Sequence, residues 1–424
     1  MSAMLKEILT DLIILAGMAA IAAGRIPGLR MNRAAIAMAA AGALLAIGAI
    51  PLEEAYAAID MGTIILLLSM MVIVASMKMS GAFDLVAYRM AGLASRPVMF
   101  LAGTIAVSGV LSALFLNDTM CLVLGPVVAE TCIRARRNPI PFLVATATAA
   151  NIGSAATIIG NPQNMLIGAR SGISFTDFFM GIGPVAAIGL ALCCLIVIVV
   201  FPGEFLPAIA RRRYRKAPPI PGDSTATGGM VVGAVLTDRR LLTKSAIASV
   251  LMLGGFIAGV PVVIAALVPA AIILVSRRVE SGKVFAGVDF NLLVFFCGLF
   301  VITAAVTKTA AFAWLEAGLI SGSLISPWMF TGSTTVISNL ISNVPAVMVL
   351  SPIVEASADP RASWLLLSMS STFAGNLTLL GSVANLIVAE GAASRGVKLD
   401  FWSYLKAGLP ITLATLAVGT FMMR

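Results

Sequence analysis

The stretch that decides the fold reads Gly160-Asn161-Pro162-Gln163-Asn164-Met165-Leu166-Ile167, and it recurs 221 residues later as Gly381-Ser382-Val383-Ala384-Asn385-Leu386-Ile387-Val388. Each copy inserts glycine and polar residues into a long apolar run. Glycine, proline and asparagine interrupt helices because they favour turns or remove a backbone donor. The sequence therefore predicts two matching helices, each broken at the same point.

Further matches extend this repeat over most of the chain. Asp60-Met61-Gly62 matches Asp289-Phe290-Asn291 at an offset of 229, and an offset of 226 relates Asn117, Pro126 and Pro184 to Asn343, Pro352 and Pro410. We therefore expect a first transmembrane repeat, residues 1–203, and a second, residues 241–424. Residues 204–240 between them contain basic and proline-rich runs, a composition typical of a linker, which we place in the cytoplasm.

The composition is that of a membrane protein. Apolar residues make up 60% of the chain, charged residues 11%, and the mean hydropathy is +1.04. A soluble domain carries about 25% charged residues, whereas here apolar runs as long as a bilayer is thick recur from end to end. The net charge of +9 comes from short basic clusters between these runs, which fits the positive-inside rule better than binding to nucleic acid.

The same composition argues against an enzyme. The chain has no histidine, and its five cysteines show no metal-ligand or redox spacing. Histidine is the commonest general base and metal ligand, so a membrane metalloenzyme is disfavoured. We expect no catalytic residues, no metal site and no cofactor.

Basic clusters predict a re-entrant hairpin at residues 97–133. Arg96 precedes this segment and Arg134, Arg136 and Arg137 follow it, so both ends belong on the cytoplasmic side. The segment therefore enters the membrane and returns, with Asn117-Asp118-Thr119 at its tip. Non-helical backbone at membrane depth is tolerated only where it lines a cavity or is buried in protein.

The matching hairpin, residues 327–359, contains no Lys or Arg and ends at Glu355 and Asp359. It therefore belongs on the outside. An odd number of crossings in each half would insert the second half upside down and leave both termini external. We expect an all-α polytopic membrane protein with two inverted-topology repeats, about ten spanning helices, two re-entrant helical hairpins and two broken helices.

Four polar interruptions, the two hairpin tips and the two helix breaks, form the predicted solute site. In transporters with inverted repeats, such interruptions meet near the membrane midplane, where carbonyls and helix N-termini bind the solute. The alternative is that these residues only form turns and interhelical hydrogen bonds. The candidate solute-binding residues are Asn117, Thr119, Asn151, Gly153, Ser154, Asn161, Asn164, Ser342, Asn343, Asn376, Thr378, Ser382 and Asn385.

Asp118 is the one acidic residue that we place deep in the membrane. An intramembrane carboxylate is energetically expensive and usually marks an ion or proton pathway. We therefore assign Asp118 to ion or proton coupling. Its alternative role is to cap the returning helix of the hairpin by accepting backbone N–H bonds.

The runs that carry these residues resemble a known group of proteins. They are Phe115-Leu116-Asn117-Asp118-Thr119, Ala150-Asn151-Ile152-Gly153-Ser154, Gly160-Asn161-Pro162-Gln163-Asn164 and Ile341-Ser342-Asn343-Val344-Pro345. Together they resemble the ion transporter superfamily, which includes arsenite efflux pumps of the ArsB type, sodium/proton antiporters of the NhaD type, silicic acid effluxers and divalent anion/sodium symporters. The symporters carry Ser-Asn-Thr at both hairpin tips, and this chain departs from that pattern.

The Asn-Asp tip is most similar to that of the arsenite pumps. This resemblance implies proton-coupled efflux of arsenite or antimonite across the inner (plasma) membrane. Cys121, one turn beyond the tip, is a candidate soft ligand for As(III), and its alternative role is packing as a buried cysteine. The resemblance also allows a homodimer and a soluble ATPase partner subunit. The alternatives are sodium- or proton-coupled transport of a dicarboxylate or silicate, sodium/proton antiport and, in a different class, a passive anion channel.

Overall fold

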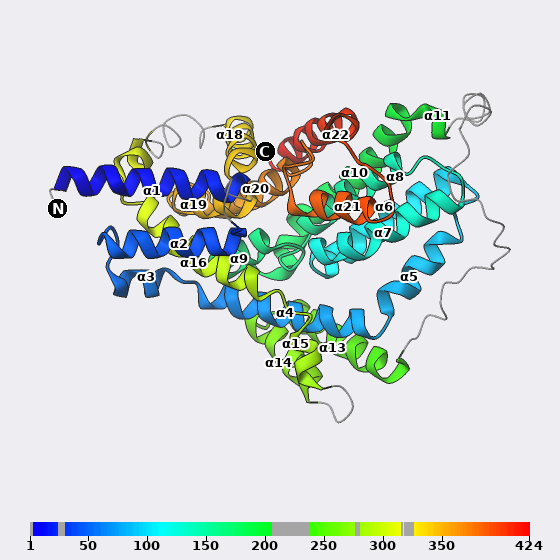
Figure 1. Cartoon of the computed structure of the whole chain (residues 1–424), viewed down its shortest axis with the longest axis horizontal. Coiled ribbons are helices and arrows are strands. Elements are labelled where there is room, and N and C mark those ends of the chain that lie inside the picture. Colours follow the sequence, from blue (N-terminus) through cyan, green and yellow to red (C-terminus); the bar gives the residue numbers. More distant parts are fainter. Residues whose placement is uncertain (1–2, 24–29, 206–237, 276–279, 315–316, 318–325) are drawn as a thin grey trace.

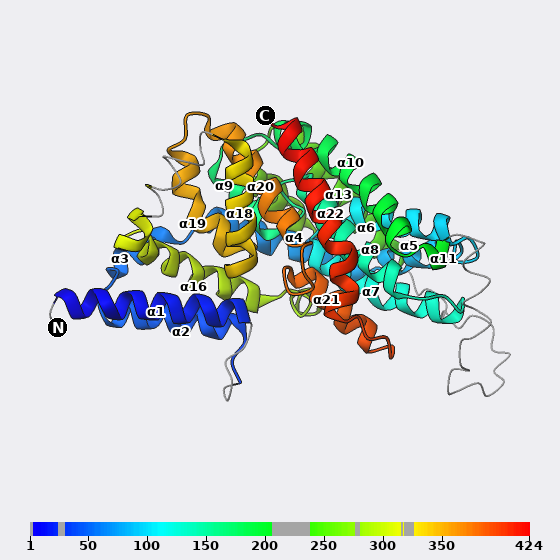
Figure 2. The same cartoon turned by 90° about the horizontal axis from the view of Figure 1, so that it is seen from above.

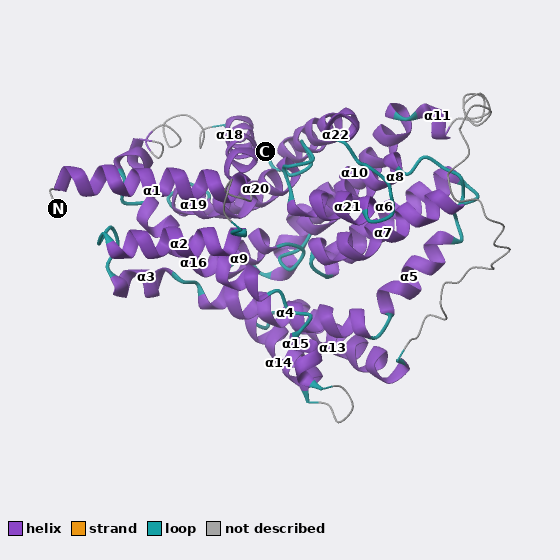
Figure 3. Ribbon diagram, viewed as in Figure 1, coloured by secondary structure: helices purple, strands orange, loops and turns teal. Residues whose placement is uncertain are grey.

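The computed structural model describes residues 3–23, 30–205, 238–275, 280–314, 317 and 326–424. Helices make up most of these parts, and no strand occurs among them (Figure 3). Most of the predicted linker, residues 204–240, lies outside the described residues. The expectation of an all-α protein is confirmed.

The helices of the first half follow one another closely along the chain (Figure 1). Their bounds are α1 (Ala3–Ala23), α2 (Arg33–Ala46), α3 (Leu52–Ala58), α4 (Met61–Met79), α5 (Ala82–Ala91), α6 (Pro97–Leu114), α7 (Asn117–Arg134), α8 (Ile140–Ala155), α9 (Pro162–Arg170), α10 (Phe175–Val200) and α11 (Pro202–Phe205).

The second half also contains a helical hairpin followed by a broken helix and a long final helix. Its helices are α13 (Arg239–Ile257), α14 (Val262–Leu274), α15 (Ser281–Phe285), α16 (Phe290–Val306), α18 (Pro327–Ile341), α19 (Asn343–Glu355), α20 (Pro360–Ala374), α21 (Val383–Ala393) and α22 (Phe401–Met422).

Both predicted hairpins and both broken helices are present. Helices α6 and α7 pack against each other as one hairpin, and α18 and α19 as the other. The first broken helix consists of α8 and α9, and the second of α20 and α21 (Figure 2). Within the described residues, five helices, α4, α6, α10, α13 and α22, are by length and composition able to cross a membrane, and shorter apolar helices accompany them.

The exact position of the interruptions differs from the expectation. Asn117-Asp118-Thr119 forms the first turn of α7, and the link between the hairpin helices is Phe115-Leu116. Asn151 to Ser154 likewise lies in the last turns of α8, and the break follows it. Polar residues fit both positions because the first N–H groups and the last C=O groups of a helix have no partner within that helix and need polar neighbours.

Matching residues of the two halves have the same local role, that of capping a helix. The Asp60 carboxylate accepts a hydrogen bond from the Thr63 N–H at 2.8 Å, and the Asp289 carboxylate accepts one from the Leu292 N–H at 3.2 Å. The pairs Asn161 and Ser382, and Ser174 and Asp400, also cap the helices that follow them. The sequence repeat thus recurs in the local structure, whereas the upside-down insertion of the second half stays a prediction.

Helix α8 lies at the centre of the molecule. Every residue from Pro141 to Ala155 is buried, and α8 contacts α6, α7, α10, α20, α21 and α22. Gly153 permits the closest of these approaches, because a Cβ at this position would overlap the backbone of Gly109 on α6. This central position brings Asn151, near the C-terminal end of α8, between the two halves of the chain.

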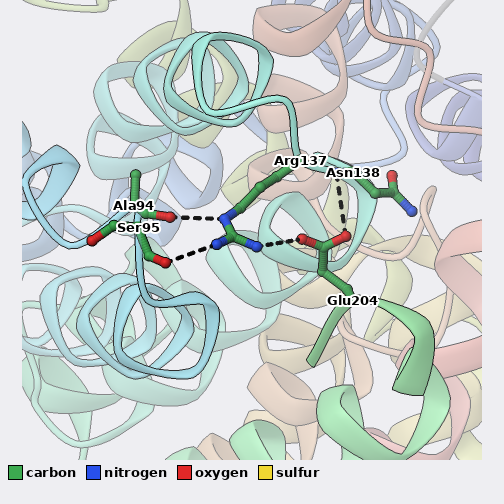
Figure 4. A network of polar contacts seen from close by, with 5 residues as sticks. All are labelled: Ala94, Ser95, Arg137, Asn138 and Glu204. Carbon is green, nitrogen blue, oxygen red and sulfur yellow. Dashed lines mark hydrogen bonds and ion pairs between the residues drawn. The ribbon is translucent and has the colours of Figure 1, made fainter. Parts of the chain in front are cut away.

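A partly buried charged cluster lies at the base of the first hairpin (Figure 4). The Arg137 guanidinium donates to the carbonyl oxygens of Ala94 and Ser95 at 2.7 and 2.9 Å and pairs with Glu204 at 3.2 Å. The Asn138 N–H donates to the second Glu204 oxygen at 3.4 Å. Since α6 begins just after Ser95 and α7 ends just before Arg137, the cluster ties both ends of the hairpin to α11.

Candidate functional site

Both hairpin tips face one cavity of about 1380 Å³. Helices α2, α4, α5, α9, α15, α16 and α21 also contribute to its wall. The structure therefore brings together residues from both halves of the chain that are far apart in sequence. The predicted site residues that line the cavity are Asn117, Asp118, Thr119, Ser342, Asn343 and Ser382.

Asn151 connects the cavity wall to both broken helices. Its Oδ1 accepts hydrogen bonds from Asn117 Nδ2 at 3.0 Å and from Ser382 Oγ at 3.3 Å. Its Nδ2 donates to Asn376 Oδ1 at 2.9 Å and to Asn385 Oδ1 at 3.1 Å. One buried amide thus holds a hairpin tip of the first half against the helix break of the second.

Asn164 and Asn385 brace the two helix breaks in the same way. Asn164 Nδ2 donates to the carbonyl oxygens of Ser154 and Thr157 at 3.3 and 2.9 Å. Asn385 Nδ2 donates to those of Gly375 and Thr378 at 2.7 and 3.0 Å. In both cases the acceptors lie ten and seven residues before the asparagine, so the two amides replace backbone partners that the broken helices lack.

The remaining predicted residues lie behind the cavity wall. Asn161 caps α9 and donates to Ser154 Oγ at 3.0 Å. Gly153 forms the contact between α8 and α6. Cys121 is fully buried on α7 and does not belong to the cavity lining among the described residues. These positions support the site through packing and hydrogen bonding rather than by facing the cavity.

The cavity also contains charged residues that sequence reasoning did not select. Arg33 at the start of α2 and Asp289 before α16 are close enough to Asp118 for electrostatic interaction. The remaining charged residues of the lining are Lys78, Asp84, Lys283 and Glu390. The only sequence signal for any of these was the match between Asp60 and Asp289. Gln163, which lies within the repeated stretch, also lines the cavity and donates to Thr372 Oγ1 at 3.3 Å.

The side-chain oxygen of Asn117 lacks a hydrogen bond to the described residues, whereas both of its nitrogen atoms donate one. Its Nδ2 donates to Asn151, and its backbone N–H donates to the Gly160 carbonyl at 3.0 Å. Within the described chain, its buried Oδ1 has no hydrogen-bond partner. Asn117 lines the cavity next to Asp118, so the cavity wall contains a buried acceptor without a donor, and a hydroxyl group is the kind of donor that would satisfy it.

Comparison with known proteins identifies the family. The citrate transporter family (CitMHS) matches residues 12–374. The silicon efflux transporter LSI3 of Oryza sativa subsp. japonica is 33% identical over 93% of each chain. The putative transporter arsB of Dictyostelium discoideum is 25% identical over 92% of this chain and 87% of its own length.

A solved structure supports the fold. The YdaH transporter of Alcanivorax borkumensis superposes with a TM-score of 0.54 over 99% of this chain and 97% of its own, at 15% identity. A similarity at this identity shows the fold alone. The family match covers most of the chain, and the chain belongs to the citrate transporter family as a multi-pass membrane transporter.

Proposed function

We propose that the protein is a secondary active transporter that exports arsenite or antimonite in exchange for protons by alternating access. The observation that carries this proposal is the single cavity in which the Asn117-Asp118 tip meets the second hairpin tip. Its wall offers amides, hydroxyls and one deep carboxylate. Arsenite at neutral pH is an uncharged trihydroxide, which can donate to such acceptors and accept from such donors.

The charges of the cavity support a neutral solute. Among the described residues, the lining holds three cationic side chains, Arg33, Lys78 and Lys283, and four acidic ones, Asp84, Asp118, Asp289 and Glu390, and these seven sum to a formal charge of −1. Protonation of Asp118 brings this charge to zero. When Asp118 is protonated, the positive and negative charges of these lining residues are equal in number, which suits an uncharged solute. We therefore assign proton coupling to Asp118.

The second candidate solute is citrate or another carboxylate. Arg33, Lys78 and Lys283 favour it, because guanidinium and ammonium groups bind carboxylates strongly, and the family takes its description from citrate transport. Four acidic side chains in the same lining oppose a trivalent anion. Silicic acid, the substrate class that the name of the rice relative indicates, shares the chemistry of arsenite as a neutral hydroxide.

Flux into everted membrane vesicles tests the proposal. Arsenite, antimonite, silicic acid and citrate would be offered in turn, with and without an imposed pH gradient and with and without sodium. We expect uptake of a metalloid hydroxide that depends on the pH gradient. Sodium-dependent uptake of citrate with no signal for arsenite, antimonite or silicic acid would overturn the assignment.

A further inference from the structure

The two hairpin tips share a serine and an asparagine at matching positions, but the hydrogen bond between them forms in one tip only. The offset of 226 that relates Asn117 to Asn343 also relates Ser112 to Ser338. In the second hairpin, Ser338 Oγ donates to Asn343 Oδ1 at 2.7 Å. This bond joins the last turn of α18 to the first residue of α19 across the tip.

In the first hairpin the equivalent serine and asparagine form no hydrogen bond with each other. Ser112 Oγ and Asn117 Oδ1 are both buried, and neither has a partner in the part of the chain that the structure describes. Buried polar atoms are almost always hydrogen-bonded. Ser112 Oγ and Asn117 Oδ1 both lack a partner among the described residues, although the equivalent atoms of the second hairpin bond each other, and this difference needs an explanation. Asn117 also lines the cavity, as Asn343 does.

The backbone of the two tips accounts for the difference. The second tip has a single linking residue, Ser342, with φ 76° and ψ 157°, a conformation that is essentially restricted to glycine. The first tip has two linking residues, of which Leu116, the counterpart of Ser342, has an ordinary extended conformation at φ −64° and ψ 124°. The second tip thus has a strained backbone and a serine–asparagine hydrogen bond. The first tip has an unstrained backbone and lacks that bond, and we call this its open form.

We propose that Ser112 is a positioning residue that donates a hydrogen bond to Asn117 Oδ1 when the carrier returns without solute. In the open form seen here, Asn117 Oδ1 is buried without a partner among the described residues, in the wall of the cavity that Asn117 lines, and in the loaded carrier a hydroxyl group of the solute would become its donor. In the bonded form, which the second hairpin displays, the serine occupies this acceptor. This alternation rests on the proposed function, because it requires a carrier that returns empty and a solute that can donate hydrogen bonds.

The chain provides a matched control one turn away. Ser108 lies on the same buried face of α6 as Ser112, and its hydroxyl also has no partner among the described residues. The hydroxyl of its counterpart, Thr334, likewise has no partner in the described parts of the chain. Ser108 and Thr334 therefore do not differ in hydrogen bonding between the two hairpins. Removing the Ser108 hydroxyl deletes the same chemical group as Ser112→Ala but leaves the tip unaffected.

The test measures net efflux and solute exchange in proteoliposomes for the unaltered protein, Ser112→Ala, Ser112→Thr and Ser108→Ala. The probe is whichever of arsenite, silicic acid or citrate the unaltered protein carries. Only net efflux requires the return of an empty carrier, so Ser112→Ala should slow net efflux about threefold to tenfold, the worth of one hydrogen bond. Exchange should be unchanged, and Ser112→Thr, which keeps the hydroxyl, should restore net efflux.

Melting in detergent separates this role from a structural one. Ser112→Ala removes no bond of the open form and should melt like the unaltered protein, whereas Ser338→Ala, which leaves Asn343 Oδ1 without its donor, should melt lower. Equal loss of net efflux and exchange in Ser112→Ala, the same loss in Ser108→Ala, or no loss at all would overturn the inference. Failure of the unaltered protein to carry any probe would instead refute the proposed function on which the inference rests.

Discussion

Asn151 is the residue whose removal should damage the protein most. Its side chain makes four hydrogen bonds to partners from both halves, and it is 1% exposed. Asn151→Ala removes all four. Hydrogen bonds between helices within a membrane are worth about 0.6 kcal/mol on average and up to about 1.7 kcal/mol. We therefore expect a loss of about 2–4 kcal/mol in the free energy of unfolding.

Asn339→Ala is the control for this variant. Asn339 on α18 makes two hydrogen bonds, from its Nδ2 to the carbonyl oxygens of Thr335 and Ala374, and both acceptors lie in the second half. The same substitution there should cost about half as much. Asn151→Asp provides a second comparison, because it retains an acceptor for Asn117 but places an oxygen against the acceptor oxygens of Asn376 and Asn385.

Denaturation in mixed detergent micelles, with helix content as the readout, gives the three values. We expect the order Asn339→Ala, Asn151→Ala and Asn151→Asp from least to most destabilised, since the aspartate adds a buried charge to the lost donors. If Asn151→Ala lost no more stability than Asn339→Ala, the idea that this amide joins the two halves would be refuted.

Four further predictions concern Asp118, the second hairpin tip, the base of the first hairpin and the membrane topology. Asp118→Asn should fold normally, keep solute exchange and lose flux driven by a pH gradient; full gradient-driven flux in a stable Asp118→Asn protein would exclude the coupling role. Ser342→Gly should raise stability by about 1 kcal/mol, because it relieves backbone strain of about 1–3 kcal/mol while the unfolded chain gains freedom, and a lower melting temperature would contradict the strain. Arg137→Lys should lower stability by about 2–3 kcal/mol, since a single ammonium cannot reach both carbonyl oxygens and the carboxylate together; unchanged denaturation would show that the cluster does not hold the hairpin base. Single cysteines near Arg136 and near Asp359, in a background without the native five, should react with an impermeant reagent from opposite sides of the membrane, and reaction from one side would remove the inverted topology.

The sequence alone determined the elements and their order. Hairpins and broken helices were predictable because glycine, proline and asparagine within apolar runs act locally, on the backbone next to them. The repeat was predictable too, since the same caps and breaks recur at constant offsets, as Asp60 with Asp289 and Asn161 with Ser382 show. The asparagines of these stretches form a buried network of hydrogen bonds, and their predicted role in binding the solute stays a prediction.

Only the tertiary structure decided which of these side chains face the cavity and which charges accompany them. Arg33 and Asp289 reach the region of Asp118 through the packing of α2 and α16 against each other and around the hairpin tips, and no local pattern encodes that contact. The difference between the tips is also tertiary: Ser112 and Ser338 occupy equivalent places in the sequence, yet only Ser338 bonds its asparagine. A sequence repeat specifies equal local preferences, whereas the bond that forms depends on the backbone that the surrounding helices impose on each tip.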